Sequence, residues 1–172
     1  VRYPERHIAV QSGIYGDLAG NVERLTEKRP DAGAAVMEWA DLDPRLGIRH
    51  LGGWGPKILP DILDTVCARI AQVQEAVQRA SARVPLAFCL PTLPLPPVSY
   101  TSGWQASQFD LQLKEHLGAF GAQLSRETRV KVIDPQRLDR RSPLGQRLDV
   151  RSELQSGFPY KLPHASVIAE LL

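Results

Sequence analysis

Two residues at opposite ends of the chain have the types that nucleophilic catalysis needs. Ser12 follows the short apolar run 7–11 and precedes Gly13. His164 lies between a proline-rich loop and the apolar stretch 167–172. A serine hydroxyl becomes an effective nucleophile when a neighbouring histidine accepts its proton. The two residues therefore predict a Ser-His pair that attacks an ester or thioester carbonyl.

Each of these residues also has a structural interpretation. Ser12 can be a turn residue that hydrogen-bonds to its own backbone, and His164 can be a capping or packing residue. A histidine beside a helix N-terminus is held neutral by the helix dipole, which leaves it able to act as a base near pH 7. The backbone N–H groups of Gly13, Gly52 and Gly53 are the candidates for stabilising the oxyanion.

The apolar periodicity predicts strands that alternate with helices. The expected strands are 7–11, 34–39, 85–90 and 130–133, and the expected helices are 17–28, 58–83, 109–124 and 167–172. Parallel strands need crossover connections, so this order favours a mostly parallel sheet with helices on both faces. We therefore expect an α/β fold, a three-layer α/β/α sandwich with a flavodoxin-like sheet of four to five strands. Residues 48–51 are the candidate fifth strand.

Three tryptophans fall in the loops expected at the carboxyl ends of the strands, namely Trp39, Trp54 and Trp104. Ligands of open parallel sheets bind beyond that edge. Aromatic side chains there can line an apolar pocket for an acyl or peptide-like group. They can equally cover the top of a small core.

Taken together, these segments resemble a known domain type. Residues 8–13 with His164 resemble the SGNH (GDSL-like) hydrolase fold, whose nucleophilic serine follows the first strand and whose histidine lies near the last helix. The whole chain is similar to the SGNH-type domain that precedes a HAD-type (haloacid-dehalogenase-like) domain in bacterial biosynthetic proteins of the phosphoglyceryl-transfer kind. The segments that carry this likeness are 38–47, 52–56, 90–97 and 157–166. The resemblance implies an esterase or acyltransferase, with an acyl group or carrier protein and the attached HAD-type domain as partners.

The chain departs from the SGNH pattern at three places. Residues 10–12 read Val-Gln-Ser where the family has Gly-Asp-Ser, and the only asparagine, Asn21, falls in the first expected helix. Lys161 stands where the family has its acid, three residues before the histidine. Asp149 and Glu153 are the candidate replacements for that acid. The alternative function is a catalytically degenerate SGNH-like domain that binds a carrier protein, an acyl group or its attached HAD-type domain.

A second motif follows the strand expected at 34–39. Asp41 and Asp43 are spaced like the two aspartates of HAD phosphatases, in which the first attacks phosphorus and the second is an acid/base. Arg45 stands where that motif has Thr or Val. An acidic turn before Pro44 is therefore the favoured interpretation.

Length and composition limit the class of protein. The 172 residues fit one domain, residues 1–172, and the formal net charge of +2 is too small for a nucleic-acid footprint. No apolar run reaches the length of a membrane span. Cys67 and Cys89 lack a metal-binding spacing, which favours buried free thiols in a reducing compartment. We therefore expect a cytoplasmic domain, cut from a longer protein, that uses no metal or cofactor and binds neither nucleic acid nor membrane.

Overall fold

The structure is a computed structural model that describes residues 9–14, 16–50, 57–96 and 105–172. Its helices and strands in chain order are α1 (Leu18–Lys28), β1 (Gly33–Val36), α2 (Trp39–Leu42), α3 (Leu59–Ser81), β2 (Leu86–Cys89), α4 (Gln108–Leu124), β3 (Val130–Ile133), α5 (Val150–Ser156) and α6 (Leu162–Leu171). Short 3₁₀ helices connect them at η1 (Pro44–Leu46), η2 (Ile48–His50), η3 (Pro135–Leu138) and η4 (Leu144–Gln146).

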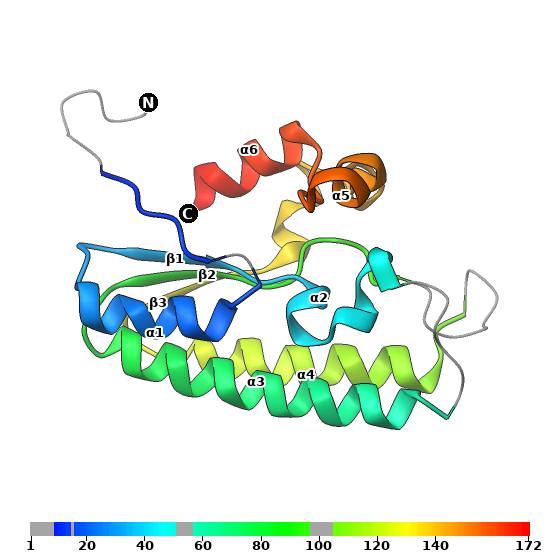
Figure 1. The fold of residues 1–172 in the computed structure, drawn as a ribbon, viewed down its shortest axis with the longest axis horizontal. Helices are drawn as coiled ribbons and strands as arrows, with labels where there is room; N and C mark the ends of the chain where they lie inside the picture. The colour runs from blue at the N-terminus through cyan, green and yellow to red at the C-terminus, as the bar shows by residue number, and fades with distance from the viewer. Residues whose placement is uncertain (1–8, 15, 51–56, 97–104) are drawn as a thin grey trace.

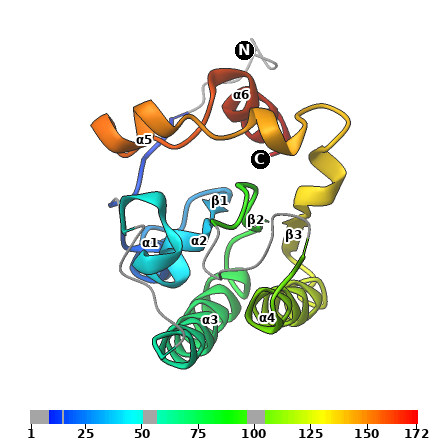
Figure 2. The ribbon, with the colours of Figure 1, turned by 90° about the vertical axis from the view of Figure 1, so that its right-hand side faces the viewer.

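A parallel sheet of three strands, in the order β1-β2-β3, forms the middle layer of the described fold (Figure 1). Gly33 lies opposite Leu86, which lies opposite Val130 on the other side. The helices α3 and α4 both lie on one face of the sheet (Figure 2). Right-handed crossovers between strands that are added in one direction produce this arrangement.

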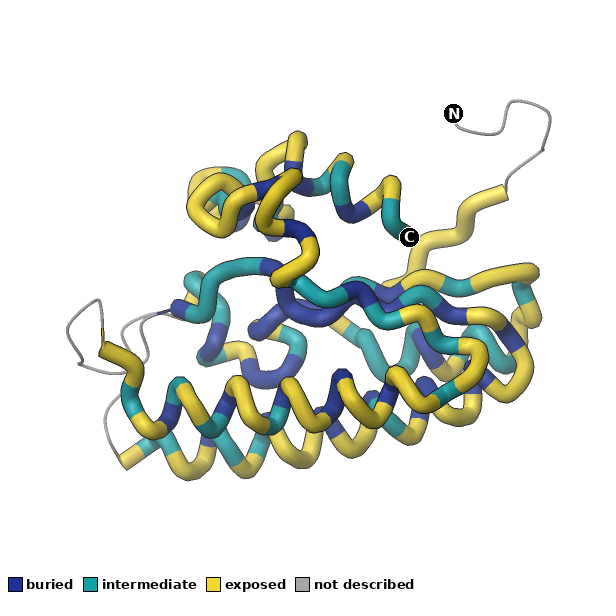
Figure 3. The backbone as a smooth tube through the Cα atoms, turned by 180° about the vertical axis from the view of Figure 1, so that it is seen from behind, coloured by how far each residue is buried: buried dark blue, intermediate teal, exposed yellow. Residues whose placement is uncertain are grey.

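Two clusters of buried apolar residues fill the spaces on the two faces of the sheet. The larger one joins β1 and β2 to α1, α3 and α4, and within it the rings of Phe88 and Phe120 meet edge to face at 5.7 Å. The smaller one joins the opposite face to α6 through Cys89, Ile133 and Ile168. In the tube of Figure 3 the outer sides of the helices are exposed, and among the strands the central one, β2, is the most buried. The layers are therefore helices, sheet and helices.

The expected helices 17–28, 58–83 and 109–124 are confirmed to within a few residues as α1, α3 and α4. The side chain of Asp17 caps α1 by accepting from the Gly20 N–H at 3.1 Å. Ser107 and Asp110 form a reciprocal capping box at the start of α4. Such caps satisfy N–H groups that have no partner inside the helix.

The expected first strand is wrong for the residues that the structure describes. Residues 9–11 are exposed and form no strand, and Val10 is 85% exposed, while residues 7 and 8 lie outside the described ranges. A flavodoxin-like order would place this strand between the two that follow it, but β1 pairs directly with β2. The described sheet therefore has three strands rather than four to five. The physical reason is that the apolar run is short and the place beside β2 is already taken.

Three other expected elements differ from the observed ones in type or length, and the reasons are local. Residues 48–50 form η2 instead of a strand, and Leu51 lies outside the described ranges. The strand expected at 34–39 stops at Val36, because Glu38 and Asp41 form a capping box that starts α2. The helix expected at 167–172 begins earlier, at Leu162, with proline in its first turn, where the missing N–H costs nothing.

None of the helices in the described ranges combines the length and the apolar character that a membrane span requires.

Candidate functional site

His164 is buried in the first turn of α6, with 1% of its surface exposed. Its Nε2 lies 2.9 Å from the Thr92 hydroxyl, and its Nδ1 lies 2.9 Å from the Ser142 hydroxyl. Burial, helped by the nearby charge of Arg147, lowers the pKa of His164 to about 4. The imidazole is therefore neutral at pH 7, and both of its nitrogens are occupied by side chains of the protein.

The structure does not bring Ser12 to His164. Ser12 lies in the exposed segment that precedes α1, and the two ring nitrogens of His164 face other hydroxyls. Gly13 has a packing role, because a Cβ there would lie 2.5 Å from the side chain of Asn21. That side chain accepts from the Ile14 N–H at 2.8 Å and donates to the Ile14 carbonyl at 2.6 Å. The segment that contains Ser12 is therefore hydrogen-bonded to α1 and not to α6.

The two acids expected to orient the histidine serve other contacts. Asp149 caps α5 by accepting from the Ser152 N–H at 3.0 Å. Glu153 pairs with Arg49, whose Nε lies 3.4 Å from Glu153 Oε1. The remaining expected residues, Gly52, Gly53, Trp54 and Trp104, lie outside the described ranges.

The carboxylate that is linked to His164 belongs to Glu38, a residue that the sequence reasoning did not select. The Thr92 hydroxyl lies 2.6 Å from Glu38 Oε1 and 2.9 Å from the His164 ring. Glu38 also accepts from the backbone N–H groups of Thr92 and Leu93 and, at 3.0 Å, from the Tyr160 hydroxyl. The available signal was position, because Glu38 lies near the end of the strand expected at 34–39, at the carboxyl edge of the sheet.

The contacts determine which group donates and which accepts along the chain formed by Glu38, Thr92, His164 and Ser142. The Thr92 hydroxyl has one proton, which it donates to the Glu38 carboxylate, so it accepts from His164 Nε2–H. His164 Nδ1 is then the acceptor for the Ser142 hydroxyl. Burial raises the pKa of Glu38 to about 7, although its four donors favour the charged form. The network is therefore able to hold or release a proton close to neutral pH.

Arg147 is the buried cation beside this network, with 1% of its surface exposed. It donates to three backbone carbonyls, those of Thr92 at 2.8 Å, Ser142 at 2.9 Å and Pro135 at 3.2 Å. Its Nη2 also pairs with Asp139 at 2.5 Å. One guanidinium thus ties together the loops that follow β2 and β3.

A cavity of about 330 Å³ opens on the other side of Glu38. It lies at the carboxyl edge of β1, between the start of α1, α2 and the segment 157–160. Trp39 lies in its wall and donates from Nε1 to the Leu93 carbonyl at 3.1 Å. Most of the other lining side chains are apolar, and they include Val36, Leu46, Leu93, Pro94 and Phe158. Ser12 and His164 do not line it.

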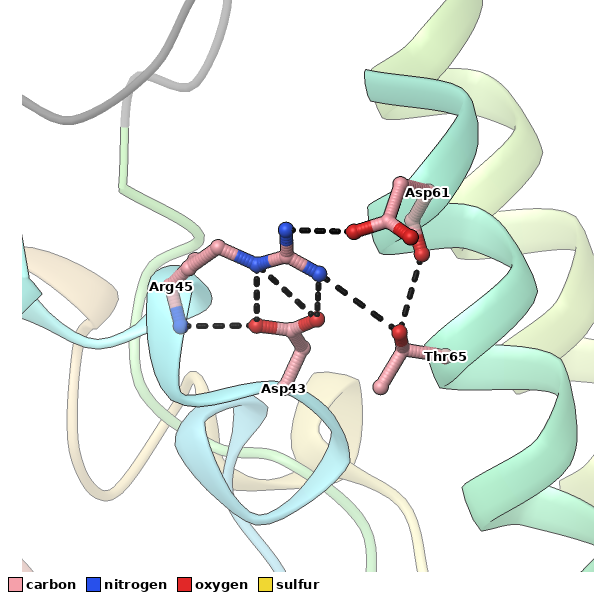
Figure 4. Close-up of polar contacts among 4 residues, drawn as sticks. All are labelled: Asp43, Arg45, Asp61 and Thr65. Atoms are coloured by element: carbon pink, nitrogen blue, oxygen red, sulfur yellow. Dashed lines mark hydrogen bonds and ion pairs between the residues drawn. The ribbon is translucent and has the colours of Figure 1, made fainter. Parts of the chain in front are cut away.

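The two aspartates of the phosphatase-like motif have structural partners, and Figure 4 shows those of Asp43. Asp43 is buried, and Arg45 holds its carboxylate with contacts of 2.6–3.2 Å while also reaching Asp61 at 2.6 Å. Asp41 accepts from the Glu38 N–H at 2.7 Å. This favours the interpretation of the motif as an acidic, ion-paired turn.

Comparisons of the chain with protein-family models, with curated proteins and with solved structures gave no match. No group of three or more His, Cys, Asp or Glu side chains in the described ranges is arranged to hold a metal ion. The cavity and the buried network are therefore the features from which a function can be inferred.

Proposed function

We propose that this domain binds a small organic group with an apolar body, such as an acyl group, in the cavity beside Glu38, and does not cleave it. The observation that supports this is the separation of the two sites: an apolar cavity of about 330 Å³ on one side of Glu38, and a histidine with both nitrogens occupied on the other. Ligand pockets are commonly about 300–1,000 Å³, mainly apolar and furnished with a few polar groups. Glu38 and Tyr160 are such groups here.

The proposal corresponds to a catalytically degenerate SGNH-like domain. The helix-sheet-helix layering is compatible with that family, and the direct pairing of β1 with β2 departs from its strand order. The exposed Ser12 and the buried His164 favour binding over hydrolysis. A carrier protein and an attached HAD-type domain stay predictions, since the cavity supports only the binding of a small group.

Binding can be tested with a neutral acyl probe, S-hexanoyl-N-acetylcysteamine, in calorimetric titrations. Ala40 lines the cavity from α2, so Ala40→Trp should fill it and weaken binding by at least about tenfold, which is 1.4 kcal/mol. Ala68→Trp places the same side chain on the exposed face of α3 and should leave the affinity unchanged. Equal affinity of wild type and Ala40→Trp, or no binding by wild type, would contradict the proposal.

The absence of a Ser12-His164 reaction is a separate expected result. Wild-type protein and Ser12→Ala should both release p-nitrophenol from p-nitrophenyl acetate at the rate seen in buffer. The reason is that His164 Nε2 and Nδ1 already contact Thr92 and Ser142, so neither can take the proton of Ser12. Hydrolysis above background by wild type that is lost in Ser12→Ala would establish the esterase instead.

A further inference from the structure

The ionisable side chains that line the cavity are acidic. Four of its lining residues carry carboxyl groups, namely Asp17, Glu38, Asp41 and Glu153, and no Lys, Arg or His is among the described lining residues. A low-dielectric wall with charges of one sign attracts ligands of the opposite sign.

Two of these four acids form ion pairs with arginines, and the described residues supply no such pair for the other two. Asp17 pairs with Arg24 at 3.0 Å, and Glu153 approaches Arg49 at 3.4 Å. Glu38 and Asp41 form no ion pair within the part of the chain that the structure describes. Burial raises the pKa of both carboxyl groups, and at Asp41 the positive charge of Arg69 offsets part of that rise.

A carboxylate oxygen of Glu153 gives independent evidence for a ligand, because it has no hydrogen-bond donor among the described residues. The residue is 9% exposed and lines the cavity, and its Oε2 is a buried oxygen that accepts no hydrogen bond from the described residues. Buried oxygens of this kind are rare in folded proteins, because each one forgoes a hydrogen bond that water would provide. The terminal torsion of glutamate is broad, so Oε2 can change direction without a change in the rest of the side chain.

The rest of the wall suits a ligand that is cationic at one end and apolar elsewhere. Trp39, Phe158 and Tyr160 bring three aromatic rings to the lining, and the last two meet edge to face at 5.6 Å. Aromatic faces attract ammonium groups as well as hydrocarbon. A carboxylate or phosphate ligand would instead meet acidic side chains, and none of the described lining residues is a cation.

We propose that the cavity selects a protonated amine with an aliphatic or aromatic body, held by the carboxylates of Asp41 and Glu153 and packed against Trp39 and Phe158. This inference rests on the proposed binding function and specifies the class of group that is bound. Its decisive property is a preference for a cation over a neutral molecule of the same shape.

The test compares hexylamine, hexanol and hexanoate at pH 7.5 by ligand-observed NMR titration of the full chain. Hexylamine should bind at least about tenfold more tightly than hexanol, and hexanoate should bind most weakly. Asp41→Asn and Glu153→Gln should each reduce the preference for amine over alcohol severalfold. Asp64→Asn, which changes an exposed carboxylate on α3, should leave that preference unchanged.

The outcomes separate this inference from the function on which it rests. Binding of hexanol in each variant shows that its cavity is folded, so a lost preference is then a charge effect. Equal binding of hexylamine and hexanol by wild type, or a preference that both cavity variants retain, would overturn the amine inference and leave the binding function standing. Failure of all three probes to bind would overturn both.

Discussion

Replacing Arg147 with leucine is expected to destabilise the domain by about 3 kcal/mol or more. Three backbone carbonyls, those of Thr92, Pro135 and Ser142, would lose their donor together. Leaving a buried acceptor unsatisfied costs about 1–3 kcal/mol. Some buried ion pairs can be exchanged for apolar residues at no cost, but here the partners are mainly carbonyls, which leucine cannot satisfy. Urea unfolding at pH 7 measures the change.

Two companion variants make this expectation specific. Arg140→Leu alters an exposed arginine of the same segment and should change stability by less than about 0.5 kcal/mol. Arg147→Lys keeps the charge but loses the planar fork of donors, so it should also be destabilised. A loss below about 1 kcal/mol in Arg147→Leu would mean that the loops after β2 and β3 are held by other contacts.

Glu38 and His164 should impose opposite pH dependences on stability. Burial raises the pKa of Glu38 from 4.5 to about 7, so its contribution is present below pH 4.5 and is lost as the pH rises to 7. The pKa of His164 is lowered from 6.5 to about 4, so its contribution is present above pH 6.5 and is lost as the pH falls to 4. Between pH 4.5 and 6.5 the two effects nearly cancel in the wild type.

Replacing either Glu38 or His164 should reveal the pH dependence of stability that the other residue imposes. In His164→Gln, stability relative to wild type should fall as the pH rises from 4.5 to 6.5, by about 1.4 kcal/mol per pH unit. In Glu38→Gln, stability relative to wild type should rise over the same interval. Unfolding in urea at several pH values gives both differences. Slopes of the same sign in the two variants would show that the groups do not titrate as their burial implies.

The elements with a strong apolar pattern could be predicted from the sequence, and those with a weak pattern could not. The apolar stripe of α3, with Ile62, Val66 and Ile70, and the continuous apolar run of β2 each carry one unambiguous pattern. The helix α5 has seven residues and few buried side chains, so its pattern is too weak to distinguish from a loop. The run 7–11 looked like a strand, but a strand also needs an open place in the sheet.

The candidate site was predicted in part for a similar reason. His164 and Trp39 could be selected because residue type and position at the carboxyl edge are visible in the sequence. The partners of His164 could not be predicted, since Thr92 and Ser142 lie 72 and 22 residues away from it in the sequence. Glu38 reaches Tyr160 across 122 residues. Contacts over such separations depend on topology, which local patterns do not determine.

The unequal size of the two core clusters has a consequence for how the molecule opens. The sheet face that carries α6 is held by four buried apolar residues and by polar contacts, whereas the α3 and α4 face has a broad apolar interface. Regions with few apolar contacts open locally at lower free energy than the global unfolding. Amide protons of α6 should therefore exchange with solvent through a partial opening that leaves α3 protected. Since Phe158 and Tyr160 belong to the same layer and to the cavity wall, this opening should also disturb the cavity.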